Sequence, residues 1–146
     1  MRTRRSISTL LCFWMVFASL AYCVDESEKE KAATEAVMPW LDLVDSGQYG
    51  ESWFQAASVF RNAVSKEQWT NTMRSVRAPL GKVVTRKLKN ATLTTKLPNV
   101  PAGEYVVLQF ETSFVNAVGM IETVTPALDK DGKWKVSGYF VKRAGG

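Results

Sequence analysis

The stretch that decides the fold is GMIETVTPALDKDGKWKVSGYF, residues 119–140. Within it, DKDGK has an aspartate at the first position of a turn and a glycine at the fourth, which favours a type I turn followed by a left-handed Gly132. This three-residue loop predicts an antiparallel β-hairpin. Counting back from the turn in steps of two gives one face of the first strand: Leu128, Pro126, Val124, Glu122 and Met120. A carboxylate therefore lies among apolar residues on the face expected to be buried.

The turns also predict which residues face each other across the strands. The loop at DKDGK pairs Leu128 with Trp134, Pro126 with Val136, Val124 with Gly138, and Glu122 with Phe140. A similar loop at NAV, residues 116–118, pairs Phe114 with Met120, Thr112 with Glu122, Phe110 with Val124, and Leu108 with Pro126. Both registers bring apolar faces together, and both place Glu122 on the inner face of the sheet.

Three amphipathic helices are predicted upstream of the strands. The first has apolar residues at three- and four-residue spacing over residues 33–44, with Pro39 as a kink or a restart. The second covers residues 48–60. The third begins at a capping box formed by Ser65 and Gln68 and ends at APLG. Its inner positions are predicted to be Trp69, Met73, Val76 and Leu80.

The region between the third helix and the hairpin changes to a period of two. Residues 82–97 predict a long basic strand, in which a shift of the apolar parity indicates a β-bulge near Lys89 and Asn90. Residues 104–114, EYVVLQFETSF, predict the next strand. The fold class is therefore α+β, with three N-terminal helices packed on one face of a bent four-stranded antiparallel sheet.

The chain of 146 residues predicts a single domain preceded by an export signal. Residues 1–23 combine a basic start at Arg2, Arg4 and Arg5 with a short apolar stretch, which is typical of a signal peptide. We expect cleavage after Ala21 or Cys23, and hence a periplasmic or secreted protein. LAYC also resembles the lipobox of bacterial lipoproteins, which makes lipid anchoring at Cys23 a second option.

The mature chain is divided into three parts. Residues 24–31 are expected to form a charged, flexible lead, residues 32–142 a single domain, and residues 143–146 a loose tail. Cys23 is the last cysteine of the sequence, so the domain has no intrachain disulfide.

Several stretches together resemble one protein family. They are WLDLVDSGQYGESW, VSKEQW, RAPLG, RKL, PAGEYVVLQFETSF and ETVTPALDKDGKWKVSGYF. With these motifs the chain resembles the domain of unknown function 4019 family of exported bacterial proteins over about residues 32–142. The resemblance implies the cone-shaped fold of the nuclear transport factor 2-like group. It implies no activity, substrate or catalytic residue.

Composition excludes several functions. The sequence has no histidine, which removes serine–histidine catalysis and the usual zinc sites. It has no glycine-rich phosphate loop, and no cofactor is expected. A basic patch is predicted from Arg74, Arg77, Lys82, Arg86, Lys87 and Lys89. Because no aromatic residues alternate with these cations, we expect anionic envelope components rather than nucleic acid as their partners.

Glu122 is the best candidate for chemistry, with two interpretations. In apolar surroundings its pKa should be raised, as an acid or base that works near neutral pH requires. The residues expected to line a ligand pocket with it are Tyr49, Trp53, Thr112 and Phe140. Alternatively, Glu122 accepts hydrogen bonds from Thr112, from a tryptophan, or from Arg74 or Arg77, and holds the helices on the sheet; this structural interpretation is favoured.

Two main functions follow. The first is a non-enzymatic module that binds a small apolar ligand or a partner protein, with the outer sheet face as a candidate homodimer interface. The second is an acid/base enzyme of isomerase or dehydratase type that uses Glu122. A weaker alternative is a binder of anionic envelope components through the basic patch, and membrane contact is expected only through this patch or through lipidated Cys23.

Overall fold

The computed structural model describes residues 12–145, and side-chain environments from residue 25 onward. The predicted basic start of the signal peptide lies outside the described residues. The helices are α1 (Cys12–Asp45), α2 (Tyr49–Gln55), α3 (Ser58–Ala63), α4 (Lys66–Arg77) and the 3₁₀ helix η1 (Ala78–Leu80). The strands are β1 (Val83–Thr94), β2 (Tyr105–Phe114), β3 (Ala117–Leu128) and β4 (Trp134–Arg143). Helices followed by one antiparallel sheet of order β1-β2-β3-β4 confirm the α+β class.

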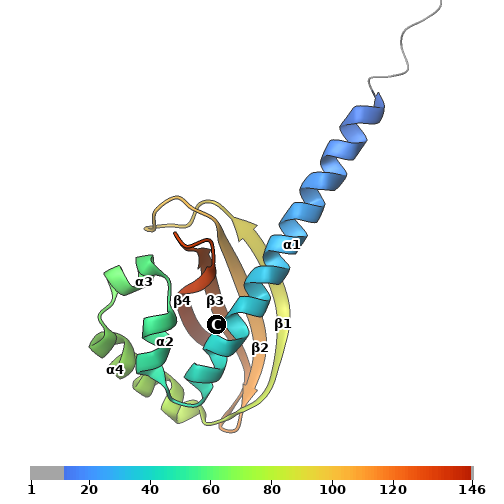
Figure 1. The fold of residues 1–146 in the computed structure, drawn as a ribbon. Helices are drawn as coiled ribbons and strands as arrows, with labels where there is room; N and C mark the ends of the chain where they lie inside the picture. Colours follow the sequence, from blue (N-terminus) through green and yellow to red (C-terminus); the bar gives the residue numbers. More distant parts are fainter. Residues whose placement is uncertain (1–11, 146) are drawn as a thin grey trace, which may run out of the picture.

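Helix α1 is longer than the sequence indicates. It lies against the sheet and extends beyond it (Figure 1), and it continues through Pro39 without a break. Residues 24–31, predicted to be a flexible lead, are part of this helix. Two side chains tie them to the sheet: Lys29 Nζ lies 2.9 Å from Glu104, and Glu30 accepts from the Leu93 N–H at 2.9 Å. None of the helices in the described part of the chain is long and apolar enough to cross a membrane.

The second predicted helix is divided into α2 and α3. The break falls at Ala56 and Ala57, whose ψ angles of 162° and 150° are extended. The Ala57 N–H donates to Val136 O at 2.8 Å, and the Asp129 carboxylate accepts from the N–H and the hydroxyl of Ser58 at 3.1 and 2.6 Å. The β3–β4 turn therefore caps α3 from a distant part of the chain.

Helix α4 begins as predicted, with reciprocal hydrogen bonds between Ser65 and Gln68 that form a capping box. Its buried residues are Trp69, Met73 and Arg77. The inner position given to Val76 is therefore wrong, since Val76 is 37% exposed and Arg77 only 4%. Arg77 points inward because the carboxylates of Asp45 and Glu122 lie there and form ion pairs with it.

The β3–β4 turn has the predicted geometry. Gly132 has a φ of 75° and its N–H donates to Asp129 O at 2.9 Å, while Leu128 faces Trp134 and Pro126 faces Val136. Beyond this point the register shifts, because Ser137 is an extra residue between Val136 and Gly138.

The shift at Ser137 overturns two predicted pairs. Val124 faces Tyr139 rather than Gly138, and Glu122 faces Val141 rather than Phe140. Tyr139 consequently turns inward, and Phe140 lies on the outer face with 53% of its surface exposed. The physical reason is Pro126: it has no N–H to donate in a central strand, and proline is confined there to bulges.

The β2–β3 register is also different, by two residues. Phe114 faces Ala117, so the loop is Val115-Asn116 and not residues 116–118. The N–H groups of these loop residues donate to Lys82 O and Leu80 O at 2.9 and 3.0 Å, which fixes the loop against the end of η1 and the segment after it. Because side chains alternate with a period of two, a two-residue shift leaves Glu122 on the inner face.

The bulge predicted in β1 is confirmed, since the pairing with β2 shifts between Leu88 and Asn90. The predicted tail at residues 143–146 begins too early: Arg143 belongs to β4, and the Ala144 N–H donates to Gly119 O at 2.8 Å.

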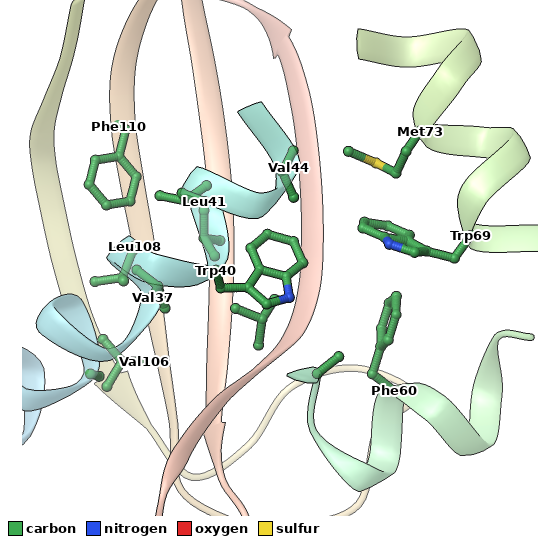
Figure 2. Close-up of a cluster of buried hydrophobic side chains, with 14 residues drawn as sticks. Val37, Trp40, Leu41, Val44, Phe60, Trp69, Met73, Val106, Leu108 and Phe110 are labelled. Atoms are coloured by element: carbon green, nitrogen blue, oxygen red, sulfur yellow. The ribbon is translucent and has the colours of Figure 1, made fainter. Parts of the chain in front are cut away.

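The hydrophobic core lies between α1, α4 and the inner sheet face. Figure 2 shows Val106, Leu108 and Phe110 of β2 facing Val37 and Leu41 of α1, with Trp69 and Met73 of α4 beside Trp40. The Trp40 indole donates to Ser52 O at 2.8 Å and the Trp69 indole to the Ser52 hydroxyl at 3.0 Å. Both indole N–H groups are thus satisfied without Glu122.

Candidate functional site

Glu122 lies on the inner face of β3 and is fully buried. Its carboxylate belongs to a group of four charged side chains that we call the ionic cluster. The cluster consists of Asp45 at the end of α1, Arg77 at the end of α4, Arg86 on β1 and Glu122. Two positive and two negative charges balance, so the core carries no net charge at this point.

Arg86 is the central member of the ionic cluster. Its Nε lies 2.7 Å from Glu122 Oε2 and its Nη2 lies 3.2 Å from Oε1. On its other side, Nη1 and Nη2 donate to the two oxygens of Asp45 at 2.7 and 2.9 Å. One guanidinium group therefore makes two hydrogen bonds to each of two carboxylates. This bidentate geometry makes arginine–carboxylate contacts strong.

Arg77 closes the cluster from the helix side. Its Nη2 donates to Asp45 at 2.7 Å and its Nη1 to Glu122 at 3.4 Å, while its guanidinium carbon lies 4.4 Å from the centre of the Phe114 ring. The shorter contact shows that Arg77 binds Asp45 more closely than Glu122. Stacking on Phe114 adds a cation–π contact inside the core.

Two hydroxyl groups complete the surroundings of Glu122. Thr112 donates to Oε2 and Tyr139 donates to Oε1, each at 2.6 Å. Every element of the sheet and two helices thus contribute to the environment of one carboxylate. We infer that the ionic cluster fixes α1 and α4 on the sheet.

The pKa of Glu122 contradicts the sequence-based expectation. Burial alone raises the pKa of this carboxyl, but the hydrogen bond and charge of Arg86, with the hydroxyls of Thr112 and Tyr139, outweigh burial and lower the pKa below its ordinary 4.5. The predicted raised pKa is therefore wrong. A carboxylate held ionised and enclosed by donors has no lone pair directed at solvent, so the argument for general acid or base chemistry is lost.

The neighbours of Glu122 have shifted pKa values as well. Burial lowers the pKa of Arg86 and is the largest single influence on it. The hydrogen bonds and charges of Asp45 and Glu122 together outweigh burial and raise this pKa above the ordinary 12.5. Burial and the Glu122 charge raise the pKa of Tyr139 well above its ordinary 10.0. Tyr139 therefore stays protonated and acts as a donor to Glu122.

Sequence reasoning found part of the cluster. The sequence predicts Thr112 and Arg77 as partners of Glu122, and both contact it. The sequence assigns Arg86 to the basic patch, and it does not connect Asp45 or Tyr139 with Glu122. A signal existed for two of them: Asp45 follows Leu41 by four residues on the apolar helix face, and Arg86 shares the parity of apolar Val84 and Leu88.

The other predicted site residues are not gathered around Glu122. Trp53 donates its indole N–H to Val64 O at 2.7 Å, and Tyr49 packs at the edge of the core. Phe140 points to the other face of the sheet. Of the basic patch, Arg77 and Arg86 are buried in the ionic cluster, whereas the remaining four side chains are exposed: Arg74, Lys82, Lys87 and Lys89.

A surface groove of about 330 Å³ lies between α1, α2 and the start of β4. We call it the aromatic groove. Its main walls are Pro39, Trp40, Phe54 and Trp134, with Lys133 and Lys135 also lining it. Phe54 is 51% exposed and carries the Lys66 ammonium 4.4 Å from its ring centre. Glu122 does not line this groove.

Replacing Tyr139 with phenylalanine tests the environment of Glu122. We expect a loss of about 1–3 kcal/mol in the free energy of unfolding, because a buried acceptor loses its donor. Urea denaturation followed by circular dichroism measures the loss. Tyr49→Phe is the matched control and should stay within about 0.5 kcal/mol of the parent. Equal stability of the two variants would show that the Tyr139 hydroxyl does not support the cluster.

Comparison with known protein families gives one match. Residues 36–139 match the family described as "Protein of unknown function (DUF4019)". The match agrees with the family resemblance of the sequence motifs. No curated protein and no solved structure matches the chain.

Proposed function

We propose that this chain, which belongs to the DUF4019 family, is an exported non-enzymatic domain that binds a small apolar ligand in the aromatic groove. The observation that carries the proposal is the groove itself: three aromatic side chains from α1, α2 and β4 line a hollow of about 330 Å³. This volume is at the lower end of the range of small-molecule pockets, which are mostly apolar with a few polar groups.

The walls of the groove support binding because they are rigid on one side and open on the other. Trp40 is 4% exposed, donates to Ser52 O, and lies 5.9 Å from the Trp69 ring centre, so it cannot turn away. Phe54 is half-exposed, and the uncovered part of its ring offers apolar surface to a ligand. A ligand that covers this surface gains hydrophobic free energy without reorganising the core.

The ionic cluster supports a non-enzymatic role. Its carboxylates are paired with guanidinium groups, and Glu122 is 0% exposed. The titratable groups that would perform proton transfer are therefore engaged in holding the fold. The cluster leaves the exposed aromatic groove as the better candidate for function.

Decanol, a neutral apolar molecule, tests the proposal. We expect saturable binding to the full protein, seen as a change in tryptophan fluorescence because Trp40 and Trp134 line the groove. Phe54→Ala should weaken binding at least about tenfold, which corresponds to about 1.4 kcal/mol. Folding of each variant is checked by urea denaturation.

Phe140→Ala is the matched control for Phe54→Ala. The two phenylalanines are 53% and 51% exposed but lie in different places, one on the outer sheet face and one in the groove. The proposal requires that Phe140→Ala binds decanol like the parent. Absence of saturable binding, or an equal loss in both variants, would contradict it.

A second candidate function is association through the outer sheet face. The exposed Phe140 favours it, and the predicted homodimer would use this face. Loss of decanol binding in Phe140→Ala alone, or a changed oligomeric state in size-exclusion chromatography, would support the outer sheet face and not the groove as the functional surface.

A further inference from the structure

We propose that the ligand of the aromatic groove carries a single anionic head group, a carboxylate, which the ammonium group of Lys133 binds. The inference rests on the proposed function, because it concerns the ligand class of the same groove. It adds a specificity that an apolar groove alone does not provide.

The charges that line the groove are the first support. The two charged side chains among its lining residues are both lysines, Lys133 and Lys135. An apolar hollow whose charged groups are all positive is complementary to an apolar molecule with a negative end. A cationic ligand would be repelled at the same place.

The two lysines are not equivalent. The Lys135 ammonium lies 2.7 Å from Asp131 and 3.5 Å from Asp129, so acidic side chains of the turn already neutralise it. Lys133 is exposed, and its ammonium has no carboxylate partner within the part of the chain that the structure describes. Lys133 is therefore the cation that remains for a ligand.

The backbone holds Lys133 at the groove. Its N–H donates to Asp131 Oδ1 at 3.1 Å, and its carbonyl accepts from the Asp129 N–H at 2.9 Å. Gly132, with φ at 75°, sets the direction of the turn. Trp134 follows directly, so the ammonium and an aromatic wall of the groove come from adjacent residues. The head group and the apolar body of one ligand can thus be bound together.

The strength of the preference follows from the surroundings. An exposed ion pair is worth little in water. Next to the indole of Trp134, part of the water around the ammonium and the carboxylate is displaced, and the contact strengthens. We therefore expect a moderate preference of about tenfold for an acid over a neutral ligand of equal length, and a preference that added salt weakens.

Decanoate and decanol are the two probes, because they have equal chain length and differ in the head group. Tryptophan fluorescence of the full protein is titrated with each at pH 7 and low salt. We expect decanoate to bind about tenfold more tightly than decanol, and this ratio to fall as salt is raised. Lys133→Met should abolish the preference and leave the affinity for decanol unchanged.

Lys130→Met is the matched control, since Lys130 lies in the same turn and is exposed but does not line the groove. It should keep the full preference for decanoate. Equal loss of preference in both lysine variants would assign the effect to the general positive charge of the turn and would overturn the role of Lys133.

The outcomes separate this inference from the proposed function. If both probes bind with equal affinity and Phe54→Ala weakens both, the groove binds apolar ligands and the acidic head group is refuted. If neither probe binds, both proposals fail. If decanoate binding needs Lys133 but is unaffected by Phe54→Ala, the anion contact lies outside the groove and the inference is overturned.

Discussion

Glu122→Gln is expected to lower the free energy of unfolding by about 3–5 kcal/mol, because it removes one partner from a buried set of charges. Glutamine has nearly the same shape, so packing is kept while the negative charge is lost. Arg77 and Arg86 are then left with Asp45 as their carboxylate, and the core holds an uncompensated positive charge. Since a domain is stable by only about 5–15 kcal/mol in total, the effect should be large in urea denaturation.

Glu111→Gln is the control for this prediction. Glu111 is exposed on the outer face of β2, and the same change of charge there should alter stability by less than about 0.5 kcal/mol. If Glu122→Gln were as stable as the control, the structural role of the cluster would be refuted.

The same variant separates structure from function. Glu122 does not line the aromatic groove, so the fraction of Glu122→Gln that remains folded should bind decanol like the parent. Unchanged stability together with lost binding would instead mark Glu122 as part of a ligand site and would reverse the order of the two hypotheses.

The turn and cap chemistry of this fold could be predicted from sequence because it is local. The DKDG turn and the box of Ser65 and Gln68 each depend on residues within five positions, and both occur as predicted. The inner position of Glu122 was also predictable, although the β2–β3 register was wrong. A two-residue error preserves the face of a strand, and only odd shifts reverse it.

The surroundings of Glu122 were less predictable because they depend on a one-residue shift in the β3–β4 register. Ser137 is the extra residue of the bulge, and its hydroxyl donates to Thr125 O at 2.7 Å. After it, Tyr139 replaces Phe140 on the inner face. The signal for this bulge was Pro126, a proline in what the topology makes a central strand. Sequence periodicity alone does not locate the bulge, and so it does not show which residues of the strand face inward beyond it.

The long-range partners of Glu122 were the hardest part to predict. Asp45 and Arg86 are 41 positions apart in sequence and meet through the packing of α1 on β1. Charged residues at apolar positions usually indicate an error in the pattern or an exposed edge. Here four such charged residues form ion pairs with one another, namely Asp45, Arg77, Arg86 and Glu122. Their pairing makes each charge acceptable in the core.

Arg86→Met is the second large expected effect, and its size should depend on pH. Near pH 7 we expect a loss of about 3–5 kcal/mol in the free energy of unfolding, because Glu122 keeps its charge while losing its closest cation. Methionine retains most of the apolar volume of the side chain, so the loss reports on the charge. Lys87→Met, the next residue on β1 and exposed, is the control and should have little effect at any pH.

The pH dependence follows from the pKa of Glu122. In the parent this pKa is lowered in the folded state, so the stability it provides is present above the ordinary value of 4.5 and is lost as the pH falls through the lowered value. In Arg86→Met the main cause of the lowering is gone, burial dominates, and the folded pKa should be raised. The variant then regains stability as the pH falls from this raised pKa towards 4.5, because its folded form takes up a proton on Glu122 before the unfolded chain does. The difference in the free energy of unfolding between parent and variant should therefore become smaller from pH 7 to pH 4. If this difference stayed constant or grew, Arg86 would stabilise the fold by packing and not through the charge of Glu122.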